Sequence, residues 1–456
     1  MSKPAKKSLK YPFRSVCNII TTLFVMLSFA YIWYNNLNPL QLKSFLMKGN
    51  FLVIGIYMFF FLLFMSVFGG FKLGIYTKTN IIISQTIALF CASFMQILFV
   101  IMLVGKVGHI PAILLSFLKM YVVQIVFVFF FTMVAMTIYH KFFNPYELLH
   151  IYADENDNIS KRFMNQHLNY VIKDKVSCFD TMENIISHID NFDLVMIDDI
   201  PTDKREIIQN ICYSKEKKVY FVPSITDIIN KNSKYSHLLD TPLYFYKSNA
   251  MSVFEKIVKR IGDIFISTIG IIITSPIMIA IAAAIFSYDK GPVFYKQTRY
   301  TKGGKIFKII KFRSMIQNAE NDGKARLASE NDDRITPVGR FIRACRIDEL
   351  PQFFNILKGD MSIVGPRPER PEIADEYCKQ LPEFKYRLYV KAGLTGYAQV
   401  YGKYNTTFVD KLKLDMIYVG NASILLDIQL ILLTLKVIFQ KESTEGLEEG
   451  KTIATK

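Results

Sequence analysis

The first 139 residues contain four long apolar segments, and these constrain the fold of the chain more than any other feature. The segments run near residues 16–33, 51–71, 81–104 and 110–139. At a rise of about 1.5 Å per residue, a helix over each segment can cross a hydrocarbon layer of about 30 Å. Helices buried inside a soluble protein rarely reach this length, so the sequence predicts four transmembrane helices in residues 1–143.

Positive charge before the first apolar segment predicts the orientation of the chain. The basic residues there are Lys3, Lys6, Lys7, Lys10 and Arg14. Such residues are retained on the cytoplasmic side of a membrane, and no small-residue cleavage pattern follows the segment. We therefore expect an uncleaved anchor with a cytoplasmic N-terminus. An even number of spans then returns the rest of the chain to the cytoplasmic face.

The composition excludes an ordinary soluble protein and argues against nucleic acid as a partner. Of the 456 residues 51% are hydrophobic and 38 are Phe, while the formal net charge is +16. The basic residues flank apolar segments or lie in a block at 296–313, which suits anionic lipid headgroups and a phosphorylated substrate. The six cysteines show no CxxC or zinc-ligand spacing, so we expect reduced cysteines in a protein that faces the cytosol.

Residues 144–248 are more polar and predict a small α/β domain. Short apolar runs at 148–152, 192–197, 219–222 and 243–246 alternate there with polar, helix-like stretches. A dinucleotide-binding fold carries GxGxxG after its first strand, whereas this chain has ADENDN at 153–158. Without a glycine, cofactor phosphates would meet carboxylates. We interpret the region as a packing or regulatory domain rather than an NAD-dependent enzyme.

Residues 261–287 form a further apolar segment, which Ser275 and Pro276 interrupt near its middle. Proline removes a helical hydrogen bond and clashes with the preceding turn, so we expect a kink there. The flanking basic residues are Lys256, Lys259 and Arg260 before the segment and the block at 296–313 after it. Positive charge on both flanks predicts that both ends stay cytoplasmic. A re-entrant hairpin satisfies this requirement, and a kinked transmembrane helix is the alternative.

Residues 343–369 concentrate the groups that indicate an active site. An apolar stripe with Pro351 at its start and Gly359 at its end predicts a short helix, with Asp348 and Glu349 at its positive end. The helix dipole favours ionised carboxylates and bound phosphate at that end. Neighbouring residues on a helix point about 100° apart, so the two acids must have different roles. The alternative interpretation is a solvated helix start.

Arg367 lies between Pro366 and Pro368, which stiffen the backbone and present its guanidinium with little entropy left to lose. Phosphate is the natural partner of such a group. In the basic block, Lys311 and Arg313 are candidates for contact with a diphosphate, on a strand with alternating charged and apolar residues. A stiff loop and headgroup-binding lysines are the alternatives.

The order of several motifs resembles the bacterial sugar transferases, the polyprenyl-phosphate hexose-1-phosphate transferases. The motifs are KRxxD (Lys259, Arg260, Asp263), SP (Ser275, Pro276), GPVFYKQxR (291–299), KFRSM (311–315), DDRITPVGRFIR (332–343), IDELPQ (347–352) and KGDMSIVGPRPE (358–369). The whole length is similar to the long form of this family. The resemblance implies four N-terminal transmembrane helices in residues 1–143, a degenerate Rossmann-like domain at 144–248, and a mixed α/β catalytic domain at 249–440. It also implies a re-entrant membrane helix at 254–288.

The resemblance implies an activity as well. A sugar-1-phosphate would pass from a nucleotide diphosphate-sugar, with UDP as the expected nucleotide, to polyprenyl phosphate in a bacterial inner membrane, and UMP would be released. Asp348 would attack phosphorus with Glu349 assisting, Mg²⁺ would be held by this pair, and Arg367, Lys311, Arg313 and Arg299 would bind phosphate or nucleotide. Long-form relatives also suggest a homodimer. Two alternatives remain, namely a metal-dependent glycosyltransferase that releases UDP, and a non-catalytic scaffold of polysaccharide assembly.

Three departures from the family pattern, at Thr301, at Cys345 and at 392–403, leave Asp348, Glu349 and Arg367 intact and bear on the choice of nucleotide sugar. Near the C-terminus, residues 424–439 are apolar but include Asp427 and Lys436, which predicts an interfacial helix rather than another span. The polar residues 441–456 predict a flexible tail.

Overall fold

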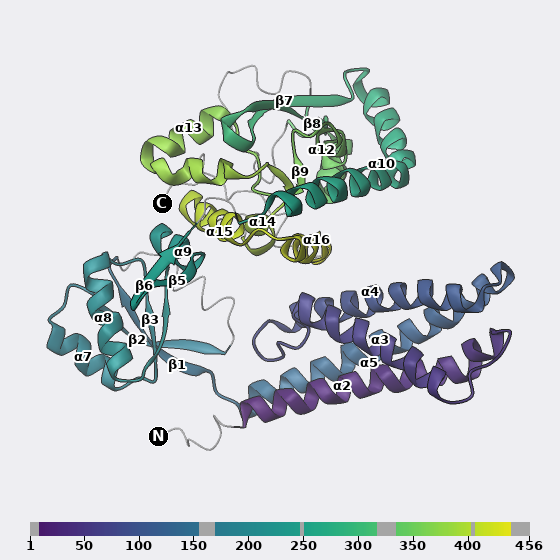
Figure 1. Cartoon of the computed structure of the whole chain (residues 1–456), viewed down its shortest axis with the longest axis horizontal. Helices are drawn as coiled ribbons and strands as arrows, with labels where there is room; N and C mark the ends of the chain where they lie inside the picture. Colours follow the sequence, from purple (N-terminus) through teal and green to yellow (C-terminus); the bar gives the residue numbers. More distant parts are fainter. Residues whose placement is uncertain (1–8, 155–168, 247–249, 317–333, 403–405, 439–456) are drawn as a thin grey trace. The chain divides into compact units, whose positions relative to one another are not determined.

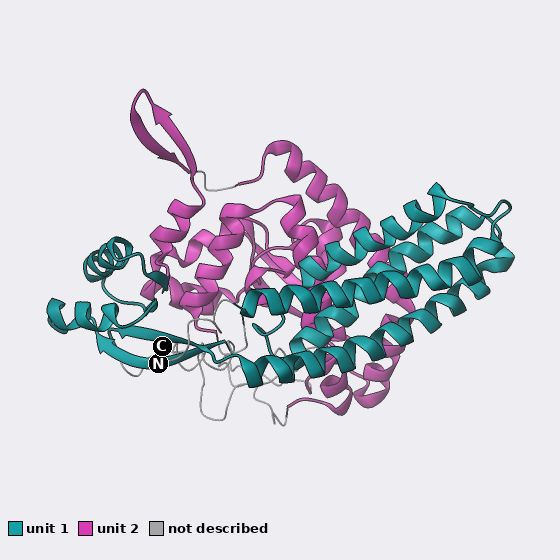
Figure 2. Cartoon of the chain, turned by 90° about the horizontal axis from the view of Figure 1, so that it is seen from below, with its two compact units in different colours: residues 1–222 teal, residues 223–456 magenta. Residues whose placement is uncertain are grey.

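The computed structural model describes residues 9–154, 169–246, 250–316, 334–402 and 406–438 (Figure 1). The chain forms two compact units, residues 1–222 and 223–456, which Figure 2 distinguishes by colour. The predicted tail at 441–456 lies outside the described residues, as do residues 155–158 of the predicted acidic loop.

Four apolar helices open unit 1 and lie side by side (Figure 1). They are α2 (Lys10–Ile32), α3 (Lys48–Phe68), α4 (Lys78–Val104) and α5 (Ile110–Phe142), and α2 continues through η1 (Trp33–Leu37) and η2 (Asn38–Leu40). With α10 of unit 2, these account for the five helices among the described residues that are long and apolar enough to cross a membrane. The expected apolar N-terminal helices are present, and their insertion in a bilayer stays a prediction.

Several buried polar side chains in the interior of this bundle are uncharged and bond to one another. Tyr57 Oη donates to Gln124 Oε1 at 3.0 Å, and Gln124 Nε2 donates to Ser28 Oγ at 2.7 Å. Thr132 Oγ1 donates to Gln85 Oε1 at 2.8 Å. Such hydrogen bonds join helices where the surroundings offer no water. They therefore tie α2, α3, α4 and α5 together.

The rest of unit 1 is a small α/β domain with a parallel sheet, as predicted. Its strands are β1 (Tyr146–Tyr152), β2 (Tyr170–Ser177), β3 (Leu194–Ile197) and β4 (Lys218–Phe221), in the order β2-β1-β3-β4, with helices α7 (Met182–Asp190) and α8 (Thr202–Ser214). This is the strand order of a flavodoxin-like sheet, whereas a dinucleotide-binding sheet would place its third strand beyond β2. The predicted α/β domain is therefore present, but the described strands do not follow the dinucleotide-binding order of the Rossmann-like domain that the resemblance implied.

The two units divide at Val222 and Pro223, well before the predicted domain boundary at 248. Helix α9 (Ile225–Lys231) is the reason, because its buried Ile228 shares a hydrophobic cluster with side chains of α15 (Phe408–Asn421). Composition does not reveal which core so short a helix joins. The hairpin that follows, β5 (Lys234–Leu238) and β6 (Thr241–Phe245), is exposed along both strands.

Helix α10 (Val253–Asp289) agrees closely with the predicted segment 254–288, and Figure 1 shows that it changes direction partway along its length. Pro276 lies inside it and has no N–H to offer the carbonyl of Ile272, four residues earlier. Ser275 Oγ donates to that carbonyl at 2.8 Å and compensates for the lost bond. The predicted break at Ser275 and Pro276 thus has a physical basis. Around it, Ile273 is 69% exposed, which suits contact with lipid.

The remaining elements of unit 2 pack around an apolar core and further apolar clusters. They are β7 (Phe294–Tyr300), η4 (Lys302–Gly304), β8 (Ile306–Phe312), α11 (Pro337–Ala344), η5 (Ile347–Glu349), α12 (Gln352–Lys358), β9 (Ser362–Val364), α13 (Pro371–Gln380), η6 (Pro382–Tyr389), β10 (Gly393–Thr395), α14 (Tyr397–Tyr401), α15 and α16 (Ile424–Ile438). Strands β7 and β8 form an antiparallel hairpin, while β9 and β10 pair in parallel. Ile309, Ile356, Val364 and Leu430 meet in the core and fix β8, α12, β9 and α16 against one another.

Candidate active site

The acidic pair occupies the short 3-10 turn η5, between α11 and α12. Arg346 precedes it with a left-handed φ of 55°, a backbone conformation that is uncommon outside glycine and concentrates at functional sites. Pro351 is the N-cap of α12 and lies one residue before its first helical position, because the chain first makes a tighter i to i+3 turn at Leu350. The predicted end at Gly359 is confirmed, with φ at 96°.

Glu349 is buried and is the centre of a charged cluster. Lys311 Nζ on β8 donates to Glu349 Oε1 at 2.8 Å, and Arg367 Nη2 donates to the same oxygen at 2.9 Å. Burial alone would raise the pKa of Glu349, but the two cations hold it well below its usual range. Burial also lowers the pKa of Lys311, while Glu349 raises that of Arg367. Three of the predicted site residues therefore meet in one cluster.

Asp348 stands apart from this cluster although it is the adjacent residue. It is half-buried, and within the described part of the chain its carboxylate accepts no hydrogen bond. Burial raises its pKa, as does the negative charge of Glu349, while Lys311 and Arg367 act in the opposite direction. One acid of the pair thus holds the cations, and the other is available to a substrate. This asymmetry agrees with the expectation that their roles differ.

The structure gives Arg299 and Arg313 other partners than the acidic pair. Arg299 Nη1 donates to the carbonyl oxygen of Pro368 at 3.0 Å. Arg313 is buried and forms an ion pair with both carboxylate oxygens of Asp289, at the end of α10. In the structure both arginines therefore bind other parts of the protein. Their contact with phosphate stays a prediction.

The first half of α10 holds both segments that carry the site. Arg260 donates to the carbonyls of Ile356 and Leu357 at 2.6 and 2.7 Å, at the end of α12. Asp263 Oδ1 accepts from the N–H of Ile363 at 2.9 Å, in the strand before the Pro366–Pro368 turn. Lys259 Nζ donates to the carbonyl of Val364 at 3.0 Å. The bent apolar helix is therefore bonded directly to the helix that follows the acidic pair and to the strand that precedes Arg367.

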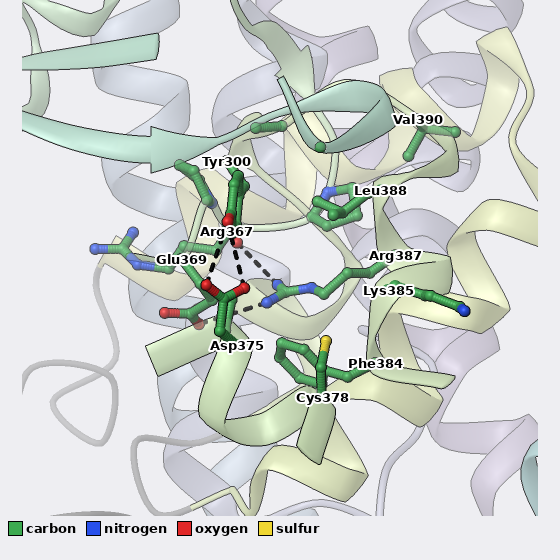
Figure 3. A pocket seen from close by; sticks show the side chains of 15 residues that line it. Tyr300, Arg367, Glu369, Asp375, Cys378, Phe384, Lys385, Arg387, Leu388 and Val390 are labelled. Carbon is green, nitrogen blue, oxygen red and sulfur yellow. Dashed lines mark hydrogen bonds and ion pairs between the residues drawn. The ribbon is translucent and has the colours of Figure 1, made fainter. Parts of the chain in front are cut away.

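A pocket of about 240 Å³ lies behind the backbone of residues 366–369, between this loop, α13 and η6 (Figure 3). Asp375 accepts a hydrogen bond from Tyr300 Oη at 3.3 Å on one side, and Arg387 lies on the other. Asp348 and Glu349 do not line it. The pocket adjoins the charged cluster and does not contain it.

Sequence reasoning missed Arg387 and Asp415, which are both buried. Arg387 Nη2 forms an ion pair with Asp415 Oδ2 at 2.7 Å and donates a hydrogen bond to the carbonyl oxygen of Arg367 at 2.8 Å. No local pattern marks either residue, because their partners lie far away in the chain. The KRxxD motif did carry a signal for Lys259, Arg260 and Asp263, without showing what they bind.

The residues of the acidic pair fit the expected Mg²⁺. Magnesium in phosphoryl-transfer sites is commonly held by one or two carboxylates together with substrate phosphates and water. Asp348 supplies a carboxylate without a hydrogen-bond partner in the described structure, and Glu349 supplies a second whose charge is already paired. No group of three or more His, Cys, Asp or Glu side chains with metal-ligand geometry occurs among the described residues. A metal here would depend on the substrate for its remaining ligands.

Fold and site together define a class, a membrane-associated α/β protein whose charged cluster suits anionic substrates. Comparison with known proteins then gives the family. The family model described as bacterial sugar transferase matches residues 254–441. The chain is 47% identical over 131 residues to a putative undecaprenyl-phosphate N-acetylgalactosaminyl 1-phosphate transferase of Bacillus subtilis, over 29% of this chain and 73% of that protein. The chain belongs to the bacterial sugar transferase family.

Longer relatives match the same region. The chain is 40% identical over 223 residues to UDP-N-acetylgalactosamine-undecaprenyl-phosphate N-acetylgalactosaminephosphotransferase of Aeromonas hydrophila, over 48% of this chain and 52% of that protein. It is 37% identical over 221 residues to UDP-glucose:undecaprenyl-phosphate glucose-1-phosphate transferase of Klebsiella pneumoniae, over 47% of each. The chain thus spans about half the length of these curated relatives. Their names differ in the sugar, so the likeness does not select one.

Proposed function

We propose that this protein transfers a sugar-1-phosphate from a UDP-sugar to undecaprenyl phosphate, with release of UMP. The observation that carries the proposal is the asymmetry of the acidic pair. Glu349 is buried between Lys311 and Arg367, while Asp348 beside it accepts no hydrogen bond in the described structure. A site for phosphoryl transfer needs a nucleophile and compensating positive charge, and this cluster offers both.

The proposed reaction has two displacements at one phosphorus. A carboxylate oxygen of Asp348 forms a bond to the sugar-bearing phosphorus, and the bond to the bridging oxygen breaks, so that UMP leaves with the electron pair. A phosphate oxygen of the lipid then attacks the same phosphorus and displaces Asp348. The aspartate is regenerated, and the product is the undecaprenyl diphosphate-sugar.

Electrostatics decides whether Asp348 can approach a diphosphate, since two anions repel strongly in a poorly hydrated site. Lys311 and Arg367 contribute two positive charges against the one negative charge of Glu349. Arg367 is partly exposed and can turn towards phosphate oxygens, whereas half-buried Lys311 stays with Glu349. A bound Mg²⁺, held by Asp348 and Glu349, would neutralise further charge on the diphosphate.

We propose that α10 is re-entrant, with both ends on the cytoplasmic face of a bacterial inner membrane. Its exposed apolar surface and the bend at Pro276 support this proposal, as does the attachment of its first half to the site. Cysteines introduced at Lys256 and Tyr288 should then react with a membrane-impermeant reagent from the same side. Labelling from opposite sides would show that α10 crosses the bilayer.

The nucleotide product tests the proposed reaction. A panel of UDP-sugars, incubated with the purified protein and undecaprenyl phosphate, should give UMP with at least one member. Release of UDP would instead indicate a glycosyltransferase. A folded protein that releases neither nucleotide with any sugar would indicate the scaffold role.

A further inference from the structure

We infer that Arg387 is a positioning residue, which fixes the backbone of Arg367 so that its guanidinium meets Glu349 and the donor phosphates. The inference rests on the proposed function. Arg387 itself reaches the carbonyl oxygen of Arg367 and not the acidic pair. It therefore acts on the reaction through Arg367.

At two positions of the loop that carries Arg367, the backbone can form hydrogen bonds only through its carbonyl group. Pro366 and Pro368 have no N–H, so neither can donate a backbone hydrogen bond. Four consecutive carbonyls are in fact bound. The donors are the Gly393 N–H to Pro366 at 2.9 Å, Arg387 Nη2 to Arg367 at 2.8 Å, Arg299 Nη1 to Pro368 at 3.0 Å and the Tyr300 N–H to Glu369 at 3.1 Å.

Two of these four donors are arginine side chains, and they reach neighbouring carbonyls of the loop from different elements. Arg299 lies on β7 and Arg387 on η6, and Glu369 faces both, at 4.0 and 3.6 Å. Figure 3 shows Arg387 bridging the loop carbonyl and the Glu369 carboxylate. The carbonyl oxygen of Arg367 is therefore bound by the buried, charged side chain of Arg387 and not by a backbone N–H of a strand.

The surroundings of Arg387 allow it little freedom. Its side chain is buried, its Nη2 forms an ion pair with Asp415 Oδ2 on α15 at 2.7 Å, and its guanidinium carbon lies 4.9 Å from the centroid of the Phe384 ring. Partners on three sides fix its orientation. Nη2 faces the loop carbonyl and Asp415, and Nη1 faces Glu369 at 3.6 Å, whereas a lysine would keep the charge on a single nitrogen. Arg387→Lys should therefore shift the loop while retaining the charge.

The test is a double-mutant cycle on UMP release, with Arg387→Lys and Arg367→Ala made singly and together in the full chain. If Arg387 acts through Arg367, Arg387→Lys should lower kcat about tenfold or more in the wild-type background, because small displacements of catalytic groups are costly. The same change should cost less than about twofold when Arg367 is already Ala, because the effects of coupled residues are not additive.

Arg205→Lys is the matched control, since Arg205 is 5% exposed and Arg387 4%, and Arg205 lies on α8 in the other unit. It should leave UMP release unchanged, and thermal midpoints should show that every variant is folded. An equal loss from Arg387→Lys in both backgrounds would overturn the inference, as would full activity of folded Arg387→Lys. Absence of UMP release by the wild type would overturn the proposed function first, and this inference with it.

Discussion

The helix bundle of unit 1 and the charged cluster of unit 2 both bury polar groups, but they do so with different chemistry. In the bundle, Tyr57, Gln124 and Ser28 form neutral hydrogen bonds. In the cluster, Glu349 is an ion held by two cations. Neutral hydrogen bonds join helices with little desolvation cost. Buried ions need oppositely charged partners to offset their desolvation, and they exert strong electrostatic fields in the poorly hydrated interior.

The comparison indicates where function resides. A neutral network has no charge to offer to a substrate, and its use is cohesion. In the charged cluster, Asp348 has no hydrogen-bond partner in the described structure and Arg367 is partly exposed. Both groups can therefore contact a bound substrate. Substitutions in the cluster should therefore change turnover, while those in the bundle should change stability alone.

The largest effect is expected at Asp348. Asp348→Asn keeps the size of the side chain and removes its nucleophilic oxygen anion, so UMP release should vanish while the protein stays folded. Asp375→Asn is a suitable control, because Asp375 is an exposed acid of the same unit that accepts a hydrogen bond from Tyr300. Substantial turnover by Asp348→Asn would assign the chemistry to another residue.

The second effect concerns the ion that organises the cluster. Glu349→Gln should lower kcat by about 10² or more, since it releases Lys311 and Arg367 from their shared oxygen and disturbs a preorganised site. Steady-state kinetics of UMP release would measure the loss.

Removal of Mg²⁺ with a chelator should lower the rate of UMP release by the wild-type protein as well. Activity that survives chelation would refute the proposed metal.

A third prediction separates the units themselves. A chain beginning at Pro223 should keep the chemical step, because the site residues and α9 all belong to unit 2. A chain beginning at Met251 lacks α9 and its contacts with α15, so it should have a lower thermal midpoint. Loss of activity in a folded chain from Pro223 onwards would show that unit 1 contributes to catalysis.

The pH dependence of stability should reveal the ion network behind the loop. Burial raises the pKa of Asp415 to about 6 despite Arg387, so the folded protein holds a proton there more tightly than the unfolded chain does. Its contribution to stability is therefore present at low pH and is lost as the pH rises through about 6. Relative to wild type, Asp415→Asn should gain in thermal midpoint between pH 5 and pH 7.5. A constant difference would contradict this.

The smallest effect is expected in the bundle. Gln124→Leu removes the bonds to Tyr57 and Ser28, and each such bond between membrane helices contributes about 0.6 kcal/mol. The thermal midpoint should fall slightly, and kcat for UMP release should not change. A loss of turnover comparable to that of Glu349→Gln would abolish the distinction between the two regions.

Much of the fold followed from local patterns in the sequence. Apolar length predicted the long helices, Pro276 predicted the bend in α10, and Gly359 predicted the end of α12. The meeting of Lys311, Glu349 and Arg367 agrees with the motifs that suggested a phosphate site. These features depend on periodicity, on backbone restrictions or on a recognisable motif, all of which are visible in a single chain.

The features that escaped prediction depend on contacts between distant segments. Arg387 and Asp415 acquire their meaning only once η6, α15 and the loop of Arg367 come together. Arg299 and Arg313 carry a charge suited to phosphate, but tertiary structure gives them a carbonyl and a carboxylate. The packing of α9 could not be predicted either, because the hydrophobic cluster that it joins is formed by residues much later in the chain.

Trapping of the covalent intermediate tests the central claim most directly. The protein is incubated with a UDP-sugar labelled in the sugar, without undecaprenyl phosphate, and intact-protein mass spectrometry is combined with measurement of UMP. If Asp348 is the nucleophile, about one UMP per site should be released and one phosphosugar should remain on the protein, at the peptide containing Asp348. Kinetics with both substrates should be ping-pong. Sequential kinetics, with no adduct on the wild-type protein and no UMP until lipid is added, would contradict the claim.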